Sequence, residues 1–184
     1  MEKEIQLLIS KAHAEFRKLR NGEVGDNLRA QGIDYKTIWG LESYRLKEIA
    51  EYMRGEMPNA EVQREVAEAL WAEEVRESKM LATRLYPISD MTEELADAWA
   101  KSIPYTELAD QACMNLFARL PFAEALVARW MAGPDLLQYM ALQIALRKDL
   151  TGYADKAKAL AEDTTKPMWL RVAAQRVCAN AIEN

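Results

Sequence analysis

The feature that most constrains the fold is a unit of about 30 residues that occurs four times from residue 60 onward. Each unit contains a helix with an apolar stripe, a turn, and a second striped helix. The first helices are predicted to begin near residues 60, 91, 122 and 153, and they close with Trp71, Trp99, Trp130 and Leu160. A single helix pair cannot bury its own apolar face, so repeated pairs stack on one another. The pattern therefore predicts an all-α solenoid of antiparallel helix pairs.

The 184 residues suit one helical-repeat domain, with an atypical N-terminal helical cap over 1–58 and four helix-pair repeats over 59–184. In the cap, helical periodicity predicts a first helix over Lys3 to Leu19 and a short second helix over Val24 to Ala30. An aromatic-rich link with Tyr35 and Trp39 follows. We interpret these aromatic residues as packing of the cap onto the first repeat, with ligand contact as the alternative.

Composition argues against several classes of protein. Half of the residues are hydrophobic and only seven are glycine, which disfavours disorder. No stretch has the roughly 18 apolar residues of a membrane span, and the start does not read as a signal peptide. With one histidine and two cysteines, Cys113 and Cys178, a zinc site and a disulfide framework are both improbable. We expect free thiols in a cytoplasmic monomer, with no metal and no cofactor.

The net charge of −5 disfavours nucleic acid at first sight. The excess of acid lies entirely within 59–103, which has five basic and ten acidic residues, whereas both flanks are balanced. Since one helix of each pair in a solenoid lines the concave side, the flanks can still place basic side chains together there.

Two segments carry a resemblance to a known family. The unit AEALWAEEVRESKMLATRLY has Leu70, Trp71, Glu77 and Ala82 in a pattern of Leu-Trp, then Glu-x-Arg, then a small residue, with Lys79 in place of the arginine. The segment NLRAQGIDYKTIWGLESYRLKEIAEYM has an aromatic-rich turn leading into Leu-x-x-Ile-Ala. Both are similar to the DNA alkylation repair family, the HEAT-like alkylpurine DNA glycosylases. The resemblance implies a HEAT-like α-α superhelix with a concave face that binds duplex DNA.

The family's active-site segment has one or two tryptophans followed by Asp-x-Val-Asp at a helix start. In this chain the corresponding run is Tyr105 to Asp110, in which Asp110 keeps the catalytic carboxylate and Glu107 replaces the first aspartate. A later family landmark, Trp-x-Arg-Arg, corresponds to a segment where Tyr139 replaces tryptophan and Ala141 and Leu142 replace the arginines.

The chemistry implied by the resemblance is excision of N3- or N7-alkylated purines by hydrolysis of the N-glycosidic bond. The departing base is already cationic, so the essential group is a carboxylate that stabilises the oxocarbenium-like sugar. We assign that role to Asp110, with Glu107 second. Tyr105 and Tyr139 are expected as aromatic walls for the base. The expected phosphate contacts are Lys79, Arg129, Arg147, Lys148 and Arg171.

Other interpretations stand beside this one. Asp110 lies near a helix N-terminus, where a carboxylate also stabilises the helix dipole. The missing tryptophans and arginine favour a non-catalytic HEAT-repeat scaffold that binds DNA or a protein partner. A helical adaptor unrelated to DNA is a third hypothesis. Trp169, with Arg171 and Arg176 on the last predicted helix, could reach the concave face, but we interpret it as part of a C-terminal cap.

Overall fold

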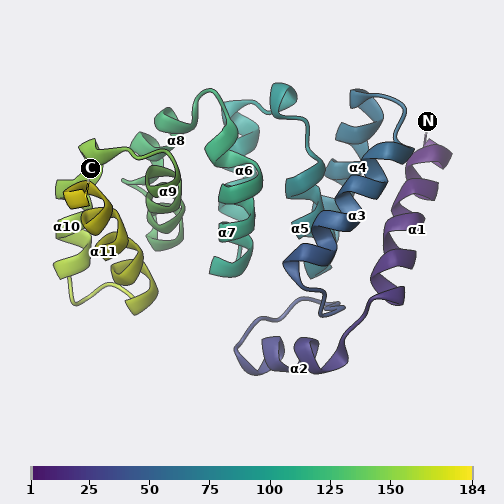
Figure 1. Cartoon of the computed structure of the whole chain (residues 1–184), viewed down its shortest axis with the longest axis horizontal. Helices are drawn as coiled ribbons and strands as arrows, with labels where there is room; N and C mark the ends of the chain where they lie inside the picture. Colours follow the sequence, from purple (N-terminus) through teal and green to yellow (C-terminus); the bar gives the residue numbers. More distant parts are fainter. Residues whose placement is uncertain (1, 184) are drawn as a thin grey trace. The chain divides into compact units, whose positions relative to one another are not determined.

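A computed structural model describes residues 2–183, which form eleven α-helices and three short 3-10 helices (Figure 1). Over this range there is no β-strand, only an isolated bridge between Thr37 and Val75. The prediction of an all-α chain of helix pairs is confirmed. The helices gather into two compact units, residues 1–90 and 91–184.

Eight helices occupy the segments predicted to form the four helix pairs. Their first helices are α4 (Ala60–Ala72), α6 (Glu93–Ser102), α8 (Ala123–Trp130) and α10 (Ala154–Glu162). Their second helices are α5 (Arg76–Leu85), α7 (Thr106–Asn115), α9 (Asp135–Arg147) and α11 (Met168–Glu183). The starts lie within two residues of the predicted positions. Side-chain caps define two of them: Asn59 accepts from the Val62 amide at 2.9 Å at the start of α4, and Thr92 accepts from the Leu95 amide at 3.2 Å at the start of α6.

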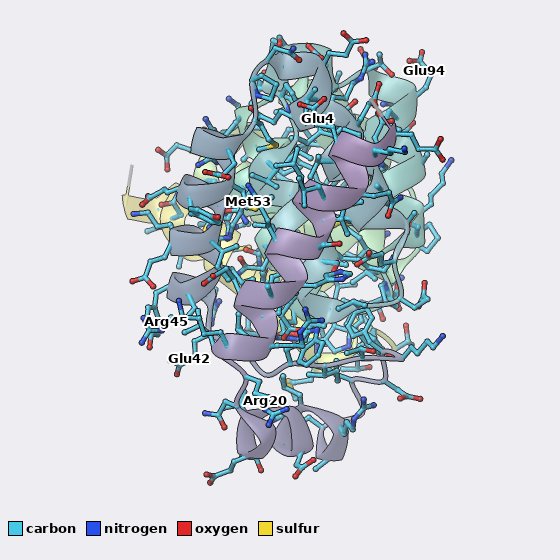
Figure 2. All side chains as sticks on the ribbon, turned by 90° about the vertical axis from the view of Figure 1, so that its right-hand side faces the viewer. Glu4, Arg20, Glu42, Arg45, Met53 and Glu94 are labelled. Carbon is cyan, nitrogen blue, oxygen red and sulfur yellow. The ribbon has the colours of Figure 1, made fainter. Side chains whose placement is uncertain are left out.

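In the first unit, α1 (Glu2–Lys18) packs on α4, and α3 (Ser43–Glu56) packs on α5. The segment expected to be an atypical cap thus contains a helix pair stacked on the first repeat, with α2 (Gly22–Ala30) inserted between its two helices. Figure 2 looks onto α1 and shows Glu4 and Arg20 at the outer surface of this unit, where both are exposed. Asn21, after the end of α1, caps α2 by accepting from the Val24 amide.

The aromatic-rich link packs against α5, as predicted. The fully buried carboxylate of Glu77 accepts hydrogen bonds from the backbone amides of Trp39 (2.9 Å), Gly40 (3.0 Å) and Leu41 (3.3 Å). The buried guanidinium of Arg76 donates to the same carboxylate at 2.6 Å and to the Leu41 carbonyl at 3.1 Å. Buried polar groups are stable only when paired, and here one ion pair ties the link to the repeat.

Gly40 is required in this link. Its φ is +77°, and a Cβ there would lie 2.0 Å from the Asn21 carbonyl oxygen. Only glycine combines a positive φ with so close a backbone approach.

In the second unit the second helices form a row, in which α9 packs against both α7 and α11 (Figure 1). The tryptophans that close the first helices are core residues, as their recurrence predicts: Trp71, Trp99 and Trp130 are only 8%, 4% and 1% exposed. Trp130 also stacks edge-on against Phe117, with ring centroids 5.1 Å apart.

Candidate active site

Asp110 lies on α7, in the row of second helices. The apolar stripe of α7, Leu108, Ala109 and Ala112, is buried. Asp110 belongs to the adjacent face, where the side chains are only partly covered: Glu107 and Gln111 are half-buried, and Met114 is 44% exposed. Helical spacing puts these four residues on one face, so Asp110 is accessible on one side and packed on the other.

Tyr139 of α9 reaches across to this carboxylate. Its hydroxyl donates a hydrogen bond of 2.9 Å to Asp110 Oδ1. The tyrosine itself is only 8% exposed. Tyr139 was expected to be an aromatic wall for the base, but most of its surface is covered and its polar end is used to hold Asp110.

The electrostatics of the pair follow from burial and charge. Burial raises the pKa of Asp110, while the Tyr139 hydrogen bond and the charges of Arg147 and Arg176 act in the opposite direction. Burial, and then the neighbouring Asp110 charge and hydrogen bond, raise the pKa of Tyr139 well above its usual value. The phenol therefore remains protonated at neutral pH and acts as a donor.

A third helix completes the surroundings. The ring of Trp169, near the start of α11, meets the Tyr139 ring edge-on with centroids 5.5 Å apart, and Trp169 is 39% exposed. Val172 and Arg176 follow on the same helix face at spacings of three and four, and both are exposed. Trp169, interpreted from sequence as part of a cap, thus contributes an open aromatic surface beside Tyr139. The helical spacing of Trp169, Val172 and Arg176 is the sequence signal that could have predicted that they share one face of the last helix.

Two residues predicted to contact phosphates interact with other groups of the protein instead. Lys79, in the first unit, is buried, donates to the Trp71 carbonyl at 2.8 Å and lies over the Trp71 ring. An ammonium group buried in this way stabilises the fold and is not accessible to a phosphate, contrary to the expectation from sequence. Arg129 of α8 forms ion pairs with Glu93 and Asp97 of α6, both at 3.0 Å.

The other predicted residues have different surroundings. Arg147, at the exposed end of α9, donates to the Gln143 side chain at 2.6 Å and contributes its charge to Asp110. Lys148 follows it and is exposed. Arg171 is half-buried, and its Nε donates to the Ala161 carbonyl at 3.2 Å. Tyr105 precedes the first turn of α7 and is half-buried.

Comparison with known proteins gives the family. The family described as DNA alkylation repair enzyme matches residues 12–147, well over half of the chain. The chain belongs to this family. No curated protein and no solved structure matches it. The resemblance inferred from the two sequence segments is confirmed, while the last helix pair, including Trp169 and Arg176, lies beyond the matched residues.

The family landmark with two arginines has no counterpart on the surface of this protein. Ala141 and Leu142, which stand in the arginine positions, are 0% and 1% exposed and belong to the core of α9. Positive charge reaches Asp110 instead from Arg147 and Arg176. The arginine charges near Asp110 therefore come from positions other than the two that the resemblance implies.

No metal site accompanies the carboxylate within residues 2–183, since no three His, Cys, Asp or Glu side chains there cluster suitably. Both cysteines are free thiols, and burial raises the pKa of Cys113, one turn after Asp110 on α7. None of the helices that the structure describes is both long and apolar enough to span a bilayer.

Proposed function

We propose that this protein binds duplex DNA and releases N3- or N7-alkylated purines, with Asp110 as the catalytic carboxylate. The observation that supports this most is the half-buried Asp110 carboxylate, held by Tyr139 and faced by Arg147 and Arg176 on neighbouring helices. Family membership supports a role in DNA alkylation repair. The proposal assigns the chemistry of that role to one face of the second unit.

The main group that the reaction requires from the enzyme is a negatively charged carboxylate. Alkylation at N3 or N7 makes the purine cationic, so the bond to the sugar breaks without protonation of the base. The sugar left behind is oxocarbenium-like, and a fixed carboxylate stabilises it and orients the attacking water. Tyr139 occupies Oδ1 of Asp110, so we assign Oδ2 to face the sugar.

The open aromatic ring in this arrangement is Trp169 rather than Tyr139. A tryptophan face attracts a cationic base more strongly than a tyrosine face does. Trp169 lies against Tyr139 and is 39% exposed, so its ring has surface left for a base displaced from the duplex. We therefore assign the aromatic contact with the damaged base to Trp169.

Arg147 and Arg176, whose charges act on Asp110, and Lys148, which follows Arg147, are exposed and are assigned to the DNA backbone. Contacts to phosphates supply affinity and register, and they make binding weaken with salt. Arg129 is a matched control, because it is also an exposed arginine but is paired with two carboxylates. We expect R147A and R176A each to weaken duplex binding and flatten its salt dependence, and R129A to change both much less.

The test of the enzymatic proposal is release of free methylated purine from an alkylated duplex. The wild type is expected to release base, D110N to lose at least about a hundredfold in rate, and E107Q, at the carboxylate ranked second, to lose less than D110N does. Equal rates for wild type and D110N would remove Asp110 from the mechanism. Absence of release by the wild type would reject the glycosylase proposal.

A second candidate function is non-catalytic binding of DNA. It is favoured by the departure from the family's active-site pattern, because Ala141 and Leu142, in the core of α9, stand at the two positions where the resemblance implies arginines. A scaffold of this kind binds duplex DNA in a salt-dependent way but releases no base. The two assays together therefore distinguish the candidates.

A further inference from the structure

We propose that Tyr139 is a positioning residue for Asp110: its hydroxyl fixes one carboxylate oxygen and favours the charged form of the half-buried carboxylate. For catalysis this inference rests on the proposed function, since a charged Asp110 matters there because the substrate is cationic. The link itself is a property of the folded protein and can be measured without any substrate.

The geometry is specific. Donor and acceptor come from successive second helices, 29 residues apart in sequence, and meet at 2.9 Å. Side chains on two packed helices have little freedom to move apart, so the bond fixes the direction of the carboxylate. An aspartate fixed in this way is preorganised, which is the condition under which a charge stabilises a transition state most.

Trp169 holds the tyrosine in turn. Its ring meets the Tyr139 ring at an interplanar angle of 80°, a favourable edge-on contact, and it comes from α11 on the other side of α9. Asp110, Tyr139 and Trp169 therefore form a chain of contacts across α7, α9 and α11. Tyr139 as a whole residue is 8% exposed, so water competes little for its hydroxyl.

The charged and titratable groups around Asp110 have opposing effects. Burial disfavours its ionisation, whereas Tyr139 and Arg147 from α9 and Arg176 from α11 favour it; Cys113, on α7 itself, is neutral because burial raises its pKa. Of the groups that favour ionisation, Tyr139 is the one in direct hydrogen-bond contact. Its removal leaves burial less opposed, and the carboxyl then keeps its proton to higher pH.

The substrate-free test is an NMR titration of the Asp110 carboxyl carbon in the full chain, assigned with D110N. The variant is Y139F, which deletes only the hydroxyl and keeps the ring against Trp169. The titration midpoint of Asp110 is expected to move to higher pH in Y139F. Y153F, which removes a hydroxyl from the 3-10 helix before α10, is the control and is expected to leave the midpoint in place. An unchanged or lower midpoint in Y139F overturns the inference, whatever the activity.

A second readout is the pH profile of base release. We expect Y139F to slow single-turnover release at neutral pH by about tenfold, the effect of losing one hydrogen bond to a charged group. The acidic limb of the pH–rate profile should shift to higher pH by the same amount as the NMR titration midpoint of Asp110. A uniform loss at every pH, with the limb unmoved, contradicts the role of the hydroxyl. If the wild type releases no base, the proposed function fails, while the NMR result still decides the positioning role.

Discussion

Replacing Glu77 by glutamine is expected to destabilise the first unit strongly. The substitution keeps the shape of the side chain but removes the negative charge that three backbone amides and Arg76 share. It also places an NH₂ group where every neighbour is a donor. Both partners of the ion pair are nearly inaccessible, with side-chain exposures of 6% for Arg76 and 0% for Glu77, so water cannot replace the lost interactions.

The expected cost follows from this burial. Removing one partner of a buried ion pair typically costs about 3–5 kcal/mol, because the other charge remains buried without compensation. Domains of this kind are stable by only about 5–15 kcal/mol, so the loss is a large part of the total. The neighbouring Glu74 provides the matched control. Its carboxylate is 69% exposed and lies 3.7 Å from Lys79, and exposed pairs contribute about 0–1 kcal/mol.

Urea unfolding at neutral pH, followed by circular dichroism, measures both variants against wild type. E77Q should lower the midpoint by an amount equivalent to about 3 kcal/mol or more, and E74Q should stay within about 1 kcal/mol. A loss below about 1 kcal/mol for E77Q would refute the reasoning, because it would mean that the link amides and Arg76 do not depend on the carboxylate charge.

Three further predictions concern stability. G40A should lower the free energy of unfolding by well over the roughly 1–3 kcal/mol that a strained φ alone costs, because a Cβ would meet the Asn21 carbonyl; a thermal melt like that of wild type would contradict this. D110N should melt at the same temperature as wild type or higher at pH 7. Burial raises the pKa of Asp110, so the protonated carboxyl stabilises the fold and this contribution is lost as the pH rises through the folded pKa. Asparagine carries no charge at any pH and does not lose this contribution. Burial opposes the ionisation of Glu73, but hydrogen bonds and positive charges outweigh it and lower the pKa of this carboxyl. The charged carboxylate therefore stabilises the fold above the unfolded pKa of 4.5, and this stabilisation is lost as the pH falls through the folded pKa. S78A removes a hydrogen-bond donor to Glu73, so it should lose less stability between pH 7 and pH 3 than wild type does.

The helix pairs could be predicted from sequence because each depends on local signals. The apolar stripes, the recurring Trp71, Trp99 and Trp130, and caps such as Thr92 all act within a few residues of one another. Their spacing fixed the starts of the helices to within two residues. The pairing of α1 with α3 could not be predicted in this way, because the inserted α2 and its link interrupt the repeat and only long-range contacts restore it.

The candidate site was predictable in part. Repeat register placed Asp110 and Tyr139 on successive second helices, and these two helices pack together. The direction of each side chain could not be predicted from the sequence. Lys79 points into the core of its unit, and the Tyr139 hydroxyl donates a hydrogen bond to Asp110. Trp169 was read as part of a cap because a terminal repeat is usually atypical, whereas its place beside Tyr139 depends on the packing of α11 against α9.

The most direct test of the central claim is the single-turnover rate at which a duplex carrying N3- and N7-methylpurines loses free base. D155N is the matched control, since Asp155 is an exposed aspartate on α10. We predict release by wild type and D155N at similar rates, and a rate for D110N lower by a factor of about a hundred or more. Release by D110N at the wild-type rate, or no release by any of the three proteins, would contradict the account.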